Sequence, residues 1–353
     1  MTPRTAHSER TAAVIGAGIA GAACARMLTD NGWAVTLFDA GRGPGGRSST
    51  RRSEQWQFDH GAQYFTVRDA RFGKQVADWI TRGAAAPWDA ELVSLRAGTH
   101  APLADQPQRF VGVPGMSALA SDLASHCTLR RNVQVTSLEP DVGGWMVRTG
   151  EGPGPGRFST VAVATQPSQA RLLLADMPDL AQRAIGAQMQ PCWATLVGFQ
   201  RRLPIPFDAA FVEDSPLRWI ARDSSKPGRL AERDSWVLHA SPAWSERSLD
   251  LSGTAAQGLM LEAFFSATGL RPEAPAHVVA HRWRSARPVA SGPATSSFSS
   301  DLRVGVCGDW LADGRVEGAY LSGVHLAAQV LAAGPQQHGV NSTSDRLESR
   351  SSR

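Results

Sequence analysis

Cysteine is scarce in this chain of 353 residues, and its four copies lie far apart. Cys24, Cys127, Cys192 and Cys307 form no Cys-x-x-Cys pair and no cluster with histidine. This spacing argues against the usual zinc motifs and against a disulfide framework. We therefore expect no metal site and a reducing, cytoplasmic compartment.

Long apolar runs and a strong charge of one sign are also missing. No stretch approaches the roughly 20 apolar residues of a membrane helix, and the polar start MTPRTAHSER is unlike a secretory leader. The net charge of +4 comes from 36 Lys and Arg against 32 Asp and Glu, spread along the chain. We therefore expect neither a membrane nor a nucleic-acid partner. Residues 336–353 are rich in Ser and Arg and poor in apolar residues, which predicts a disordered tail.

A glycine-rich turn near the N-terminus indicates a nucleotide site. Apolar residues over 12–15 predict a strand, the next six residues read Gly-Ala-Gly-Ile-Ala-Gly, and small residues over 22–29 predict a helix. In such a unit Gly16 makes the tight turn, Gly18 lets the backbone approach a pyrophosphate, and Gly21 lets the helix pack on the strand. The N-terminus of the helix then attracts the phosphates.

An acid and a second glycine-rich loop follow. A predicted strand over 35–38 leads into Asp39, about twenty residues after the glycines, where a carboxylate would accept hydrogen bonds from the ribose of an adenine nucleotide. Gly46 and Arg47 belong to a second glycine-rich loop. Its N–H groups and guanidinium suit a long dinucleotide such as FAD, although an ordinary solvated turn has the same composition.

The C-terminal part supplies a third segment. Residues 302–306 predict a buried strand, and Asp309 comes just beyond its end, where it would hold a ribityl hydroxyl or act as a helix cap. Gly318 and Ala319 lie near the start of a predicted helix. A helix N-terminus aimed at the N1 and C2 edge of a flavin would stabilise the negative charge that builds there on reduction.

These segments together resemble the amine-oxidase-like flavoprotein superfamily, and residues 58–66, Phe-Asp-His-Gly-Ala-Gln-Tyr-Phe-Thr, are similar to a signature of bacterial renalases. Further matches follow in order at 113–117, 214–222, 225–227, 236–240, 281–283 and 308–323. The resemblance covers residue 12 to about residue 331. It implies an oxidase with noncovalent FAD that passes hydride from 1,2- or 1,6-dihydro-NAD(P) to flavin N5, with dioxygen as the acceptor and hydrogen peroxide as a product.

The resemblance also implies site residues, carried over one at a time. The expected FAD contacts are Gly16, Gly18, Ile19, Gly21, Asp39, Gly46, Arg47, Ala62, Gln63, Val135, Asp309, Arg315, Val316, Glu317, Gly318 and Ala319. The expected substrate contacts are Tyr64, Phe65, Thr66, Val67 and Arg68.

Two of the candidate side chains are assigned to catalysis. The ring of Tyr64 would stack on nicotinamide, and His239 would hydrogen-bond the carboxamide or the flavin. Packing in the core is the alternative for both residues, and also for Trp193 and Trp283, two predicted strand aromatics that could roof the site.

The pattern of elements predicts an α/β fold with a Rossmann-like FAD-binding domain on a parallel sheet and a smaller α+β substrate domain on a mixed or antiparallel sheet. Glycines at 143–144 and 150–156 predict hairpin turns. We expect the FAD-binding domain to comprise 1–64, 110–187 and 288–335, and the substrate domain 65–109 and 188–287.

Three other functions remain open on the residues alone. An amine oxidase or desaturase of the same superfamily would act on another small reduced substrate. A nicotinamide-dependent dehydrogenase would need only the first glycine loop and would leave the second loop and Asp309 unexplained. A noncatalytic FAD-binding sensor would keep all three segments without turnover.

Overall fold

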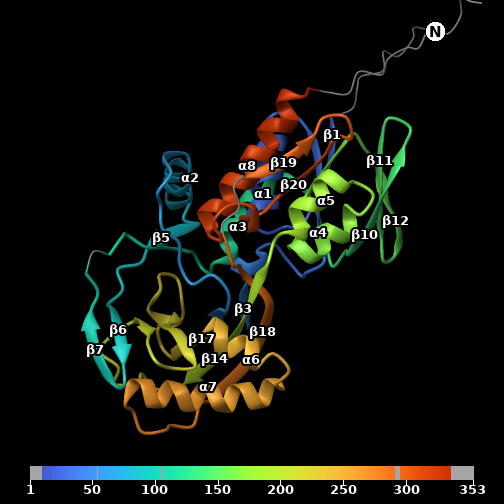
Figure 1. The fold of residues 1–353 in the computed structure, drawn as a ribbon. Coiled ribbons are helices and arrows are strands. Elements are labelled where there is room, and N and C mark those ends of the chain that lie inside the picture. Colours follow the sequence, from blue (N-terminus) through green and yellow to red (C-terminus); the bar gives the residue numbers. More distant parts are fainter. Residues whose placement is uncertain (1–9, 54, 105, 291–294, 335–353) are drawn as a thin grey trace, which may run out of the picture.

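A computed structural model describes residues 10–53, 55–104, 106–290 and 295–334. Figure 1 shows two lobes, an upper one built around β1, β20, α1 and α8 and a lower one in which α7 lies beneath a second sheet. The predicted α/β fold with a parallel nucleotide-binding sheet and a separate second sheet is confirmed. The predicted tail, 336–353, lies outside the described residues.

The upper lobe contains a six-stranded sheet in the order β19-β20-β13-β1-β2-β9. Neighbouring strands are parallel except β19, which runs antiparallel to β20. The strands are β1 (Thr11–Ile15), β2 (Ala34–Asp39), β9 (Thr128–Arg131), β13 (Thr160–Val163), β19 (Ser296–Ser299) and β20 (Val304–Cys307). Both ends and the middle of the chain therefore contribute to one sheet.

The two faces of this sheet are covered differently because side chains alternate along a strand. Ala12 and Val14 of β1 pack against one group of helices, and Ala13 and Ile15 pack against the opposite layer. The first group comprises α1 (Ile19–Asp30), α3 (Ser117–Leu123) and α8 (Val316–Ala332). The opposite layer comprises α4 (Pro167–Leu173), α5 (Pro178–Ile185) and the small sheet of β10 (Val135–Asp141), β11 (Gly144–Thr149) and β12 (Gly152–Phe158).

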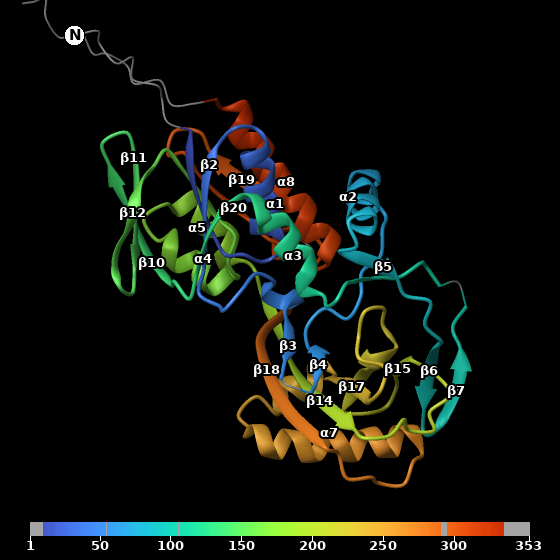
Figure 2. The same cartoon turned by 180° about the vertical axis from the view of Figure 1, so that it is seen from behind.

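Helices α1 and α8 come from opposite ends of the chain and lie side by side, as both views show (Figures 1 and 2). Their approach depends on a small residue: a Cβ at Gly323 would lie 2.0 Å from the carbonyl oxygen of Ala20. Any side chain at this position would therefore push the two helices apart.

The lower lobe holds a seven-stranded sheet in the order β18-β14-β17-β16-β15-β6-β7. All neighbours are antiparallel except β15 and β6, so the sheet is mixed, as predicted. The strands are β6 (Leu92–Arg96), β7 (Thr99–Pro102), β14 (Met189–Phe199), β15 (Ala209–Val212), β16 (Leu217–Arg222), β17 (Asp234–Ala240) and β18 (His277–Pro288). Helix α7 (Gly253–Thr268) packs on this sheet, and α6 (Pro242–Arg247) follows β17.

Short elements connect the lobes. They are the hairpin of β3 (Thr50–Arg52) and β4 (Gln57–Asp59), the pair β5 (Ala85–Pro87) and β8 (Phe110–Gly112), and helix α2 (Ala70–Thr81). Short 3₁₀ turns lie over 46–48, 124–126, 223–225 and 309–311. Phe72 and Trp79 of α2 pack against Tyr320 of α8, with ring centroids 5.4 and 6.1 Å apart. Segment 65–109 therefore contacts both lobes, and its assignment to one domain stays a prediction.

Two predicted boundaries need correction. The last strand begins at Val304, because Leu302 lies in the turn before it, and it ends at Cys307. The predicted turn over 150–156 is shorter, because β12 already begins at Gly152. The alternating glycines and prolines of β12 are tolerated because this strand lies at the edge of its small sheet, where one row of N–H groups needs no partner.

Across the described ranges, each helix falls short of the length and apolar character that crossing a membrane requires.

Candidate cofactor and substrate site

A cavity of about 1080 Å³ opens where the carboxyl ends of the parallel strands face the lower sheet. Its volume is at the upper end of the range for ligand sites, and its position is the usual one for ligands of open α/β sheets. The upper lobe contributes 15–16, 18–20, 38–40, 45–48, 61–62, 133–135, 164–166, 169, 308–310, 314–316 and 319. The lower lobe contributes 190–192, 218–219, 239–240, 242 and 282–287.

The first glycine turn has the geometry that the sequence predicts. Gly16 has a φ of +105°, and a Cβ there would lie 2.7 Å from the carbonyl oxygen of Ala164. A Cβ at Gly21 would lie 1.9 Å from the carbonyl oxygen of Gly16, so a larger residue would separate helix from strand. Nothing lies within 4 Å of a Cβ built on Gly18, which lines the cavity and leaves its backbone open to a ligand.

Asp39 lies at the carboxyl end of β2 and lines the same cavity. One carboxylate oxygen accepts the N–H of Ala17 and the other accepts the N–H of Gly41, both at 2.7 Å. A carboxylate oxygen accepts more than one hydrogen bond, so Asp39 can hold the turn and still receive a ribose hydroxyl.

The second glycine loop lies directly against the first. The N–H of Gly45 donates to the carbonyl of Ala17 at 2.9 Å, and Gly46 adopts a φ of +53° where it passes Gly18. This close approach brings the Arg47 side chain into the cavity wall.

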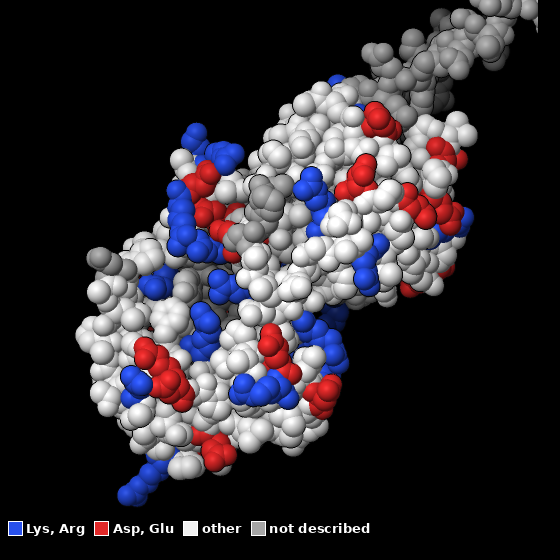
Figure 3. Space-filling view, viewed as in Figure 1, with Lys and Arg blue, Asp and Glu red and all other residues white. Residues whose placement is uncertain are grey.

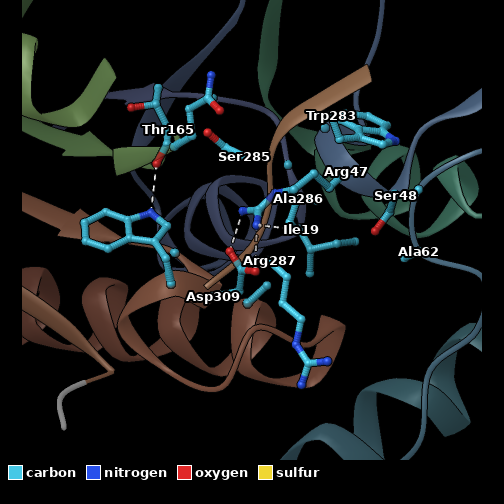
Figure 4. A pocket seen from close by; sticks show the side chains of 18 of the residues that line it. Ile19, Arg47, Ser48, Ala62, Thr165, Trp283, Ser285, Ala286, Arg287 and Asp309 are labelled. Atoms are coloured by element: carbon cyan, nitrogen blue, oxygen red, sulfur yellow. Dashed lines mark hydrogen bonds and ion pairs between the residues drawn. The ribbon is translucent and has the colours of Figure 1, made fainter. Parts of the chain in front are cut away.

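Arg47 joins this loop to the C-terminal segment. Its guanidinium forms a bidentate ion pair with Asp309, one bond of which measures 2.9 Å, across 262 residues of sequence (Figure 4). Asp309 does not cap the short helix that begins there, because the capping position belongs to Gly308. The helix-cap alternative is therefore wrong, and the carboxylate is held at the cavity by Arg47.

The start of α8 also faces the cavity. Arg315 occupies the capping position with extended backbone, and Arg315, Val316 and Ala319 line the wall. Glu317 and Gly318 do not line it. The Glu317 carboxylate is buried and accepts the N–H groups of Arg68 and Asp69 at 2.7 and 2.8 Å, whereas Gly318 lies against Asp313.

Of the remaining predicted FAD contacts, three line the cavity and one does not. Ile19, Ala62 and Val135 line the cavity. Gln63 lies behind it, 6% exposed. Its amide donates to the carbonyls of Asp59 and Gly61, and its oxygen lies 3.3 Å from the Lys226 ammonium. Gln63 thus shapes the turn that presents Ala62.

The predicted substrate segment, residues 64–68, lies behind the cavity wall instead of on it. The Tyr64 ring packs against Trp219, with centroids 5.4 Å apart, and the Arg109 guanidinium lies 5.0 Å above it. Phe65 is buried among core aromatics, Thr66 and Val67 are half-buried, and Arg68 contacts Glu317 through its backbone.

His239 lies on the interior strand β17 and lines the cavity. Its Nε2 lies 3.1 Å from the carbonyl oxygen of His60, which also accepts the indole N–H of Trp283 at 3.0 Å. Burial lowers the pKa of His239 to about 4, so the ring is neutral at pH 7. Trp283 lines the wall, whereas Trp193 packs behind it with its indole N–H on the Ser248 carbonyl.

The lower wall contains residues that were not predicted as site residues, chiefly Cys192, Arg218, Trp219, Arg284 and Arg287. Two β-bulges lie at this wall, one beside Cys192 and one beside Arg218. A bulge depends on the pairing of strands that are distant in the sequence, so the neighbouring residues do not predict it. The one feature of the sequence that could have indicated a basic wall is the repetition of arginine in β18.

The described residues fit FAD. The cavity combines an open glycine backbone, a carboxylate at the end of β2, a guanidinium and the first turn of a 17-residue helix. Such a set matches a ribose, a pyrophosphate and the electron-rich edge of a reduced flavin.

Comparison with known proteins agrees with this fit. The family model described as flavin containing amine oxidoreductase matches residues 82–331, and an NAD(P)-binding Rossmann-like domain matches residues 14–78. A putative protoporphyrinogen oxidase from Exiguobacterium sp. 255-15 has a TM-score of 0.72 at 12% identity, covering 92% of this chain and 99% of that one. A putrescine oxidase bound to putrescine has a TM-score of 0.67 at 14% identity, with the same coverage.

A curated relative matches in sequence. It is the tRNA 5-methylaminomethyl-2-thiouridine biosynthesis bifunctional protein MnmC of Magnetococcus marinus, which is 27% identical over 203 residues, and the match covers 46% of this chain. The match spans only 30% of that protein's length. The family model, by contrast, covers most of the chain. The chain therefore belongs to the flavin containing amine oxidoreductase family, and its cofactor is FAD.

Proposed function

We propose that this protein oxidises isomeric dihydronicotinamide dinucleotides, 1,2- and 1,6-dihydro-NAD(P), and delivers the electrons to dioxygen. FAD supplies the two-electron acceptor at N5. One dihydro-NAD(P), one proton and one dioxygen give one NAD(P)⁺ and one hydrogen peroxide. We infer the identity of this substrate from the resemblance of residues 58–66 and the later matching segments to renalases. The charge and protonation of the lower cavity wall support it.

The lower wall favours an anionic substrate. Arg218 and Arg284 line it without an ion pair to any residue in the described part of the chain. The two carboxylates that line the cavity, Asp39 and Asp309, lie on the upper lobe and are engaged by backbone amides and by Arg47. On the face in Figure 3, Lys and Arg side chains surround a hollowed part of the lower lobe. Phosphates are attracted to such a wall, and a protonated amine is repelled.

Two titratable groups of the lower wall, His239 and Cys192, are neutral. Burial lowers the pKa of His239 to about 4 and raises the pKa of the Cys192 thiol to about 12. A neutral histidine with so low a pKa is a weak base. A dihydronicotinamide needs no base because its ring becomes aromatic when hydride leaves, whereas an alkylammonium must first lose a proton.

The chain's own residues then act by positioning the substrate. The Trp283 indole is held by the His60 carbonyl and offers a flat apolar surface at the cavity wall. His239, held by the same carbonyl, keeps its other ring nitrogen as a hydrogen-bond acceptor for a carboxamide N–H. In this mechanism the rate acceleration comes from orienting the substrate and excluding water.

Anaerobic mixing of the yellow holoenzyme with a panel of reductants tests the proposal. We expect 1,2- and 1,6-dihydro-NAD(P) to bleach the visible absorbance of the flavin within seconds, and putrescine to leave it unchanged. Ordinary NADH serves as the matched reductant whose hydride lies at C4. Bleaching by an amine, with no response to either isomer, would overturn the proposal in favour of an amine oxidase.

A further inference from the structure

A second, smaller hollow of about 370 Å³ adjoins the main cavity on the lower lobe. Its lining residues are Phe211, Val212, Asp214, Ser215, Leu217, Arg218 and Ser241. Arg218 also lines the main cavity and is the one residue common to both linings. An arginine therefore stands where the two spaces meet.

A β-bulge places Arg218 there. In the pairing of β16 with β17, Leu217 lies opposite Ala240 and Trp219 lies opposite His239, so Arg218 is the extra residue. Successive residues of a regular strand face opposite sides of a sheet. The bulge changes the direction of the strand, and both Arg218 and Trp219 line the main cavity.

The Arg218 guanidinium is available to a ligand. Its side chain is exposed, and it has no hydrogen bond or ion pair to the described residues. The nearby Asp214 carboxylate is paired with Arg96 at 2.7 Å. A free guanidinium beside a cavity is suited to two parallel hydrogen bonds to a phosphate.

The hollow beyond Arg218 has the character of a nucleoside site. Phe211, which is half-buried, provides apolar surface. The hydroxyls of Ser215 and Ser241 accept the N–H groups of Leu217 and Trp244, so each O–H remains free to donate to a ribose or a base. Its volume lies near the lower limit for small-molecule sites.

We propose that Arg218 binds the pyrophosphate of the dinucleotide substrate, with the dihydronicotinamide half in the main cavity and the adenosine half in the outer hollow. This inference rests on the proposed function, because a dinucleotide consists of two ring-bearing halves joined by a pyrophosphate. The shared arginine between two spaces matches that arrangement. Arg218 is then a specificity residue, and it favours dinucleotides over mononucleotides.

Calorimetric titration of the FAD-loaded protein with ADP-ribose tests the outer site without any redox chemistry. We expect the wild-type protein to bind ADP-ribose and the Arg218→Gln variant to bind it at least about tenfold more weakly, the loss of one charge-assisted contact. Arg247→Gln removes the same charge from the exposed last residue of α6, which lines neither space, and should leave the affinity within about twofold. Absence of ADP-ribose binding, or equal affinity in Arg218→Gln, overturns the inference.

Stopped-flow reduction separates this inference from the proposed function. We expect 1,2-dihydro-NAD to saturate the wild-type enzyme at lower concentration than 1,2-dihydronicotinamide mononucleotide, and Arg218→Gln to remove that advantage. An unchanged advantage in the variant overturns the inference alone. If neither substrate bleaches the wild-type flavin, the proposed function fails, and the ADP-ribose titration still decides whether Arg218 binds a pyrophosphate.

Discussion

The ion pair between Arg47 and Asp309 joins the second glycine loop to the C-terminal segment, and Asp309→Asn tests it. The substitution keeps the size of the side chain and one oxygen acceptor, but it removes the charge. The side chains are 29% and 10% exposed, so water screens the pair only in part. Loss of a charge-assisted hydrogen bond in this setting costs about 1.5 kcal/mol.

This cost is measurable as a shift of the thermal midpoint. For a protein of this size it corresponds to a decrease in Tm of about 2 °C. Differential scanning calorimetry of flavin-stripped protein isolates the effect from cofactor binding. The matched control is Asp30→Asn, which breaks the exposed pair with Arg26 on α1 and should cost about 0.5 kcal/mol or less.

A double-mutant cycle with Arg47→Gln refines the test. If the two side chains stabilise the fold through each other, their substitutions should be nonadditive by about 1 kcal/mol or more. Additive effects, or an Asp309→Asn midpoint within error of Asp30→Asn, would mean that the pair of Arg47 and Asp309 does not stabilise the fold.

Three further expectations follow from the site. Asp39→Ala leaves the N–H groups of Ala17 and Gly41 without their carboxylate and should weaken FAD retention at least about tenfold, measured by flavin fluorescence after dilution. Gly21→Val should abolish FAD retention because its Cβ would lie 1.9 Å from a backbone oxygen. The control is Gly258→Ala on the exposed face of α7, which should raise the free energy of unfolding in urea by about 0.5 kcal/mol. Burial lowers the pKa of His239 in the folded protein to about 4, so as the pH falls the unfolded chain binds a proton on this side chain before the folded protein does. The contribution of His239 to stability should therefore be complete above pH 6.5 and be lost as the pH falls towards 4. Thermal midpoints between pH 4 and 7 should show this fall, and a smaller one in His239→Gln.

The nucleotide half of the fold could be predicted because its signals are local. Gly16, Gly21 and Asp39 lie within one strand-helix-strand unit, and each constrains a backbone turn within about twenty residues of the others. The return of the middle and C-terminal strands to the same sheet followed from the rules for parallel crossovers. These rules do not fix the exact residue where a strand begins, as β20 shows.

The substrate half could not be predicted as well, because its geometry depends on distant partners. Phe65 exchanges backbone hydrogen bonds with Phe110, and this pairing turns its ring into the core. Arg218 reaches the cavity only because β16 bulges against β17. Neither the inward direction of an aromatic ring nor a shift of register is encoded by the neighbouring residues alone.

The division into domains stays a prediction. The strands of the six-stranded sheet come from the segments expected for FAD binding, and the strands of the seven-stranded sheet come from those expected for the substrate. The contact of α2 with Tyr320 and the packing of Trp56 and Phe58 against Leu196 and Val237 both cross this division.

A crystal structure of the purified yellow protein would test the location of the cofactor most directly. Density for FAD should lie with its pyrophosphate against Gly18 and Arg47 and its ring between the start of α8 and the indole of Trp283. Flavin bound elsewhere, or contacts confined to the N-terminal glycine turn with Val316 and Ala319 remote from the ring, would contradict the account.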